Sequence, residues 1–194
     1  MDIIIASNNR HKIKEINEIL DSSFRLISMA EAGINEDIPE NEDTLEGNAL
    51  EKARYIHRKT GLNVIADDTG LEAEALGGAP GVHSARYAGE DKDPEKNIDR
   101  LLEELKHHNN RKARFRTVIA LILNNKEYLF EGIIQGEIRD DKRGSGGFGY
   151  DPVFIPVNES LSFAEMPAAR KNMISHRAIA VNKLREFLKK YDKQ

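Results

Sequence analysis

Short β-branched runs alternate with helical patterns along this chain, and this alternation strongly limits what the chain can fold into. Ile3-Ile4-Ile5 is a run typical of a buried strand. Apolar residues recur at helical spacing directly behind it, at Ile13, Ile16, Ile19 and Leu20. Because strand and helix patterns continue to follow one another, the sequence predicts an α/β or α+β fold around a mixed sheet.

Capping residues mark several expected boundaries. Asn9 is the expected N-cap of the first helix. Asp43-Thr44-Leu45-Glu46 resembles a capping box, in which Asp43 would cap a second helix that ends at Gly61. The next apolar run, Val64-Ile65-Ala66, predicts a short strand that stops at Asp67.

The second half of the chain carries equally clear signals. Asp93-Pro94 predicts a helix start. Arg114 to Leu123 and Glu127 to Ile134 predict two strands that turn at Asn124-Asn125. A glycine-rich loop follows from residue 144 to residue 149, and the C-terminal region has a helical pattern.

Composition excludes several functional classes. The 194 residues include 29 Lys and Arg, 33 Asp and Glu and no Cys, for a net charge of −4. Disulfide scaffolds and thiol chemistry are therefore excluded, and the acidic balance argues against binding a nucleic acid polymer. No apolar run approaches the roughly 20 residues that cross a bilayer, and the N-terminus lacks a signal-peptide pattern. We expect a soluble, cytoplasmic protein with no membrane partner.

Two segments could hold phosphate and metal. Ser7 to Lys12 joins a strand to a helix N-terminus, where free N–H groups and basic side chains favour an anion; an ordinary strand–helix turn is the alternative. Asp67-Asp68, with Glu40 from an acidic loop, offers hard oxygen ligands for Mg²⁺. Alternatively, one aspartate of the pair caps a turn and the other is solvated.

Two further segments could recognise a nucleobase. Phe148-Gly149-Tyr150-Asp151 could present an aromatic face for base stacking, although spacing alone favours a core aromatic pair. Lys171 with Ser175-His176-Arg177 supplies donors that could contact acceptor atoms on a base edge, much as Arg and Lys contact guanine O6. A basic helix start on the surface is the alternative for these residues.

Taken together, the motifs resemble one known family. Ser7 to Glu15, Ala66 to Leu71, Leu76 to Tyr87, Gly147 to Phe154 and Ser175-His176-Arg177 follow one another in order. In this order they resemble the inosine/xanthosine triphosphate pyrophosphatase family of non-canonical purine nucleotide hydrolases, across nearly the whole chain. The resemblance implies hydrolysis of XTP, ITP and dITP to the monophosphate and pyrophosphate with Mg²⁺, which cleanses the nucleotide pool and keeps these nucleotides out of DNA and RNA.

The same resemblance implies an architecture and an assembly. Residues 1–194 would form a single α/β domain of two lobes on a mixed sheet with flanking helices. The active site would occupy a cleft between the lobes, and the enzyme would be a homodimer.

The resemblance also implies a role for individual residues. Asp68 would be the catalytic acid or base and would bind the metal together with Glu40. The substrate would contact Ser7, Asn8, Asn9, Arg10, His11, Lys12, Lys52, Thr69, Phe148, Gly149, Tyr150, Asp151, Lys171, His176 and Arg177. The sequence departs from the family pattern at Asn8, Thr69, His83 and Ala178-Ile179.

Two alternatives to this function stay open at the level of sequence. One is a related pyrophosphatase, similar to the Maf family, that cleaves pyrimidine or modified nucleotides. The other is a catalytically silent nucleotide-binding module. The retained Asp67-Asp68 and Lys12 speak against the silent module, because binding alone would not need the carboxylates.

Overall fold

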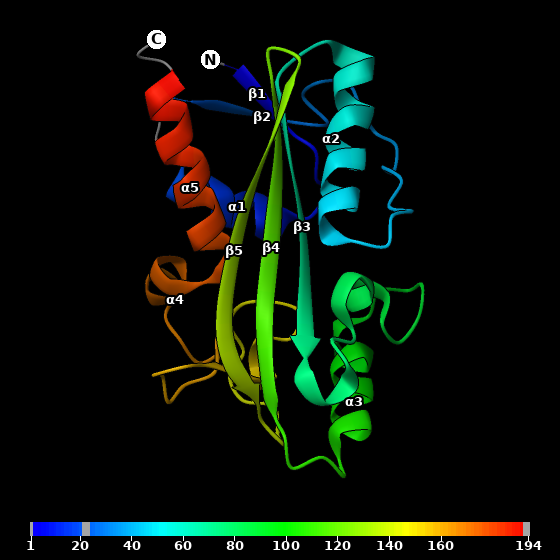
Figure 1. The fold of residues 1–194 in the computed structure, drawn as a ribbon, viewed down its shortest axis with the longest axis vertical. Coiled ribbons are helices and arrows are strands. Elements are labelled where there is room, and N and C mark those ends of the chain that lie inside the picture. Colours follow the sequence, from blue (N-terminus) through cyan, green and yellow to red (C-terminus); the bar gives the residue numbers. More distant parts are fainter. Residues whose placement is uncertain (1, 21–23, 192–194) are drawn as a thin grey trace. The chain divides into compact units, whose positions relative to one another are not determined.

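The predicted alternation of strands and helices is present in the computed structural model, which describes residues 2–20 and 24–191 (Figure 1). The strands in this part of the chain are β1 (Asp2–Ile5), β2 (Arg25–Ser28), β3 (Val64–Ala73), β4 (Lys112–Leu123), β5 (Lys126–Ile138) and β6 (Phe154–Pro156). The α-helices are α1 (Arg10–Ile19), α2 (Leu45–Thr60), α3 (Pro94–Leu105), α4 (Ala168–Ile174) and α5 (His176–Tyr191). Short 3₁₀ helices are η1 (Glu74–Leu76), η2 (Gly81–Arg86) and η3 (Asp151–Val153).

The described strands form one six-stranded sheet in the order β2-β1-β3-β4-β5-β6. β1 pairs in parallel with β2 and β3, whereas β5 and β6 are antiparallel. The sheet is therefore mixed, and the α/β class is confirmed. Among residues 2–20 and 24–191, no helix is long and apolar enough to cross a membrane.

The chain divides into two compact units, and the division falls within β3, β4 and β5. The first unit comprises the described residues of Met1–Asp68, Thr117–Gly132 and Arg177–Gln194. The second comprises Thr69–Arg116 and Ile133–His176. Each unit has its own hydrophobic core.

The first unit buries residues on both faces of its strands. One core cluster joins β1, β3 and β4 to α1 and α5, through residues that include Ile3, Ile5, Ile16, Ile65, Ile119, Leu121, Leu184 and Leu188. Alternate strand residues such as Ile4, Val64 and Val118 are also buried. They face the other side of the strands, because successive side chains in a strand point to opposite faces. Figure 1 shows α2 on the side opposite to α5, which accounts for this second burial.

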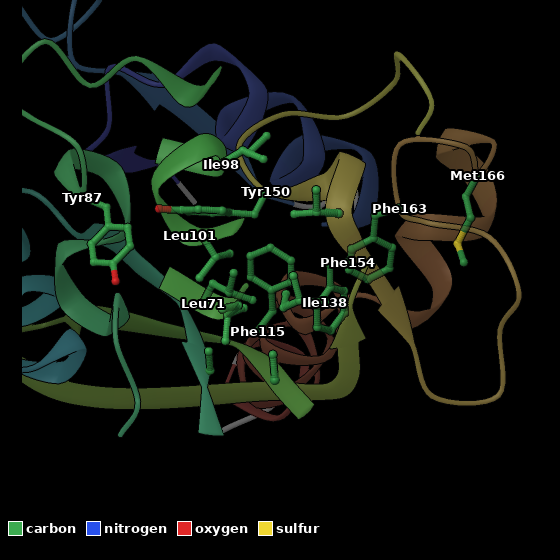
Figure 2. Packing of buried hydrophobic residues seen from close by; sticks show 14 residues of the cluster. Leu71, Tyr87, Ile98, Leu101, Phe115, Ile138, Tyr150, Phe154, Phe163 and Met166 are labelled. Carbon is green, nitrogen blue, oxygen red and sulfur yellow. The ribbon is translucent and has the colours of Figure 1, made fainter. Parts of the chain in front are cut away.

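The second unit packs an aromatic core, drawn in Figure 2. Phe115 lies edge-on to Phe154, with their ring centroids 4.7 Å apart. Apolar residues of α3, among them Ile98 and Leu101, join the same cluster. The helix predicted to start at Asp93-Pro94 therefore buries its apolar face in this core.

Several predicted boundaries are confirmed by their capping contacts. Asn9 Oδ1 accepts hydrogen bonds from the backbone N–H groups of His11 and Lys12. Gly61 ends α2 with φ of +70°, a left-handed conformation that glycine adopts without strain. Asp93 caps α3, and Asn124-Asn125 joins β4 to β5.

The predicted cap of α2 is wrong by one residue. Thr44, not Asp43, is the N-cap, and its Oγ1 accepts a hydrogen bond from Gly47 N at 3.0 Å. The turn around it is tight, because a Cβ added at Gly47 would lie 2.6 Å from the Glu42 Cβ. Two adjacent residues can both act as caps, so the sequence pattern alone did not fix the register.

Thr44→Ala should therefore lower the free energy of unfolding by about 1 kcal/mol, because the Gly47 N–H loses its acceptor. Asp43→Ala should change it by less than about 0.5 kcal/mol. Urea unfolding followed by circular dichroism measures both values. A larger loss for Asp43→Ala would restore the cap predicted from the sequence.

The predicted end of β3 is also wrong. The strand does not stop at Asp67 but continues to Ala73, so both aspartates lie in mid-strand and are buried. Their charges are offset by cationic side chains from neighbouring helices, which a local pattern does not reveal. β2 was not predicted at all, since its residues are half-buried or exposed.

Candidate functional site

The loop from Ser7 to Lys12 connects β1 to α1 and is stabilised by hydrogen bonds between its own residues. Ser7 Oγ accepts a hydrogen bond from Asn9 N at 3.2 Å, and Asn9 caps the helix. Asn8, Asn9, Arg10 and His11 are exposed, whereas Lys12 is half-buried. The loop thus presents polar and basic side chains to solvent, and its role in phosphate binding stays a prediction.

Asp67 lies at the centre of a buried charge cluster, which we call the Asp67 cluster: Lys12, Glu15, Asp67 and Arg177. Asp67 Oδ2 lies 3.1 Å from Lys12 Nζ and 3.3 Å from Arg177 Nη2. The other end of the Arg177 guanidinium pairs with Glu15 of α1. The cluster therefore ties α1, β3 and α5 together through side chains.

The Asp67 cluster holds its central carboxylate in the charged form. Burial alone would raise the pKa of Asp67, but the positive charges of Lys12 and Arg177 outweigh it and lower this pKa well below its usual range. The Arg177 side chain is fully buried. A buried arginine with carboxylates at both ends is suited to positioning, and base contact by Arg177 stays a prediction.

A second group surrounds Asp68 on the opposite face of β3, and we call it the Lys52 cluster: Glu40, Asn48, Lys52 and Asp68. Lys52 Nζ donates to Glu40 Oε1 at 2.7 Å and to Asp68 Oδ1 at 2.9 Å. Asn48 Nδ2 donates to Asp68 Oδ2 at 3.4 Å. The adjacent aspartates thus have different direct contacts, although Lys12 and Lys52 each act electrostatically on both of them.

The electrostatics of Asp68 differ from those of Asp67. Burial raises the pKa of Asp68, and the positive charge of Lys52 opposes the shift only in part. For Lys52, burial would lower the pKa, but the carboxylates of Asp68 and Glu40 outweigh it and raise the value. Lys52 is therefore firmly charged, and Asp68 is a carboxylate with an increased affinity for a proton, as suits a general base.

Sequence reasoning missed two members of these clusters. Glu15 follows Lys12 by one helical turn on α1, and Asn48 precedes Lys52 by one turn on α2. Residues three or four apart share a helix face, so this spacing was the available signal. Helical spacing does not indicate which strand residue each pair contacts.

The carboxylates of Glu40 and Asp68 are the candidate ligands for a divalent cation. Among residues 2–20 and 24–191, no group of three or more His, Cys, Asp or Glu could hold a metal ion. Two carboxylate oxygens nevertheless lie within 3 Å of one ammonium. Magnesium is usually held by one or two carboxylates together with substrate phosphates, so the donor set fits that ion.

In the second unit, Asp151 fastens the glycine-rich loop, and we call Phe148 to Asp151 the base loop. Asp151 Oδ2 accepts hydrogen bonds from Phe148 N at 2.8 Å and from Lys171 Nζ at 2.6 Å. A Cβ at Gly147 would lie 2.0 Å from this oxygen, so glycine is required there. The Lys171 ammonium also lies 4.9 Å from the centre of the half-buried Phe148 ring.

Tyr150 and His176 are buried in the aromatic core. Figure 2 shows the Tyr150 ring among the apolar side chains, and its hydroxyl donates to Ser84 O at 2.8 Å. Burial raises the pKa of this phenol. The His176 ring stacks on Phe115 with centroids 4.6 Å apart. These contacts give both residues a packing role, and their contact with a base stays a prediction.

Ser84 supports this part of the chain and was not singled out from the sequence. Its Oγ accepts from Leu71 N at 2.9 Å and donates to Gly81 O at 2.6 Å. Because Tyr150 bonds to the Ser84 carbonyl, one residue connects β3, η2 and the base loop. Thr69, the remaining predicted contact, is half-buried in β3 directly after Asp68.

The chain is similar to proteins of known classification over nearly its whole length. The sequence model of the Ham1 family matches residues 3–187. A dITP/XTP pyrophosphatase of Porphyromonas gingivalis is 57% identical over 187 residues, which cover 96% of each chain. A dITP/XTP pyrophosphatase of Flavobacterium johnsoniae is 50% identical, over 97% of this chain and 98% of the relative.

Solved structures show the same similarity. The Staphylococcus aureus Ham1 protein has a TM-score of 0.90 and 40% identity, with 98% of this chain and 100% of that chain covered. A HAM1 protein from Coxiella burnetii has a TM-score of 0.91 and 38% identity, with 98% and 99% covered. The sequence matches and the structure matches therefore both support the family resemblance that the order of the motifs indicated.

Proposed function

The chain belongs to the Ham1 family, and from that premise we propose that it hydrolyses XTP, ITP and dITP to the nucleoside monophosphate and pyrophosphate. Full-length relatives named dITP/XTP pyrophosphatase support this substrate class. The structural observation that carries the proposal is the Lys52 cluster. It sets a buried carboxylate with a raised pKa beside a charged lysine and a second carboxylate.

The triphosphate is proposed to contact the loop from Ser7 to Lys12, together with Lys52. Exposed polar side chains at a helix N-terminus favour an anion, because the helix end carries a partial positive charge. Lys52 adds a firmly held positive charge, and Lys12 adds an ammonium group whose pKa is lowered by burial against the opposing effect of Asp67. Both ammonium groups are paired with carboxylates here, so phosphate would compete for them.

Glu40 and Asp68 are the residues proposed to hold Mg²⁺. When bound, the ion offsets the charge that develops on phosphate oxygens. Asp68 is also proposed to accept the proton of the attacking water as the water oxygen bonds to phosphorus. The linkage between the α- and β-phosphates breaks, and pyrophosphate leaves. Phosphoryl chemistry of this kind depends mainly on positioning and electrostatics.

Base selection is proposed to rest on donors near the base loop. Hypoxanthine and xanthine carry an acceptor at position 6, whereas adenine carries an amino group there. Lys171 is a charged donor beside the Phe148 ring, which could stack on a base. A donor facing the adenine amino group would be left unpaired, a mismatch that discriminates strongly. Further contacts with the substrate are proposed for Thr69, Gly149, Asp151, His176 and Arg177.

The enzyme is also proposed to be a cytoplasmic homodimer.

A substrate panel tests this function. Pyrophosphate release from XTP, ITP, dITP, ATP, GTP, UTP and dTTP is measured with Mg²⁺. We expect kcat/KM for XTP and dITP to exceed that for ATP at least about 100-fold. Equal activity on ATP would contradict the base selection, and a preference for UTP or dTTP would favour a Maf-like enzyme. Nucleotide binding without turnover would leave a silent binding module.

A further inference from the structure

Lys52 occupies an unusual position for a lysine that is proposed to contact phosphate. Its ammonium lies between two carboxylates, 2.7 Å from Glu40 Oε1 and 2.9 Å from Asp68 Oδ1. The side chains of Lys52 and Asp68 are 7% and 10% exposed, so water screens this pair only weakly, whereas the Glu40 side chain is 26% exposed. The same two carboxylates are the donor set proposed for the divalent cation.

We propose that Lys52 is a built-in counter-ion which a divalent cation displaces from Glu40 and Asp68, and that displacement frees its ammonium to bind the triphosphate. The inference rests on the proposed function and adds to it a means of coupling metal binding to phosphate binding. Lys52 would thus exchange partners and would not hold the same contacts throughout the reaction.

Charge balance explains why the counter-ion is needed. Two carboxylates that share one ammonium repel each other, and burial penalises the charged form of Asp68 as well. The single positive charge of Lys52 offsets one of their two negative charges. Asn48 adds a neutral donor to Asp68 and no further charge. Without nucleotide or metal, the ammonium therefore stabilises a carboxylate pair that would otherwise be costly to bury.

The Lys52 ammonium and a divalent cation cannot both occupy the space between Glu40 and Asp68. Both oxygens lie within hydrogen-bond distance of one ammonium, so a second cation between them would meet strong repulsion from Lys52. A lysine can yield its place, because its compact charge is carried on a flexible four-carbon chain. A triphosphate then gives the displaced ammonium a new anionic partner. Linkage requires that nucleotide and metal strengthen each other's binding by the same factor.

Magnesium binding without nucleotide provides the test. Lys52→Met removes the competing ammonium, so we expect Mg²⁺ to bind at least about tenfold tighter by isothermal titration calorimetry. Lys12→Met is the matched control. It removes a lysine from the Asp67 cluster, on the other face of β3, which acts on Asp68 only at longer range, so Mg²⁺ affinity should rise clearly less than in Lys52→Met. An equal gain in both variants, or no gain in Lys52→Met, would overturn the proposal.

The coupling between metal binding and triphosphate binding can be measured separately. In the wild-type protein, a dITP analogue with a methylene group between the α- and β-phosphates should tighten Mg²⁺ binding. In Lys52→Met that enhancement should shrink about tenfold or more, because the exchanged lysine is missing. An enhancement of wild-type size in the variant would contradict displacement.

A measurement on the unaltered protein covers the case in which Lys52→Met does not fold. The ¹⁵N-ammonium resonance of Lys52 should shift when Mg²⁺ is added, while that of Lys12 stays near its position. An unmoved Lys52 signal at saturating Mg²⁺ would overturn the proposal. These binding results are independent of turnover, so failure of the substrate panel and failure of the exchange are separately visible.

Discussion

Asp68→Asn should reduce the turnover of XTP and dITP by about 10²- to 10⁴-fold, the usual contribution of a positioned general base. The amide keeps the shape of the side chain and its contact with Asn48, but it cannot take a proton from water. It also removes the negative charge of one of the two carboxylates proposed to hold the metal. Pyrophosphate release at saturating Mg²⁺ measures the loss.

The same variant should fold at least as well as the wild type. Burial raises the pKa of Asp68, which means that its charged form is disfavoured in the folded protein. A neutral amide avoids that penalty, and Lys52 keeps Glu40 as a partner. Thermal unfolding followed by circular dichroism is the control. Near-wild-type turnover in a folded Asp68→Asn protein would show that the catalytic assignment is wrong.

Arg177→Met should lower the free energy of unfolding by about 3–5 kcal/mol, the cost of removing one partner from a buried ionic group. Arg177 is fully buried and contacts Asp67 and Glu15. Its loss leaves Lys12 beside Asp67 but removes the buried guanidinium that pairs with both Asp67 and Glu15. Urea unfolding at neutral pH measures the change.

A surface pair provides the matched control for this variant. Arg54 donates two hydrogen bonds to Glu127, but both side chains are 40% exposed or more. Arg54→Met should therefore cost only about 0–1 kcal/mol. If Arg177→Met cost no more than Arg54→Met, the buried network would not have the stabilising role assigned to it.

Acid sensitivity gives a second signature of the Asp67 cluster. The pKa of Asp67 is lowered in the folded protein, so its carboxylate contributes its full stability above the ordinary aspartate pKa of about 3.9. That contribution declines as the pH falls further toward the folded pKa. Arg177→Met removes one of the charges that lower this pKa, so its stability should depend less on pH in that acidic window.

Local rules accounted for much of the fold. Asn9, Gly61 and Asp93-Pro94 act at boundaries because each satisfies or ends a helix through its immediate neighbours. β2 and the second half of β3 escaped prediction for the opposite reason. Their residues have weak apolar alternation, and their place in the sheet depends on pairing with distant strands.

The candidate site divides in a similar way. Motif order selected the residues, but not the partners that they meet. Arg177 pairs with Glu15, 162 positions earlier in the chain, and no spacing rule connects them. The buried position of Tyr150 was the alternative that spacing favoured, and Figure 2 shows its ring in the core.

The two adjacent aspartates of β3 also bear on how this gene can change. They are identical residues side by side, yet neither can replace the other, because Asp67 pairs with α1 and α5 while Asp68 pairs with α2. Loss of a single codon upstream within β3 would turn each carboxylate toward the other's neighbours. Length changes in this strand should therefore be purged by selection, even where the pair itself survives.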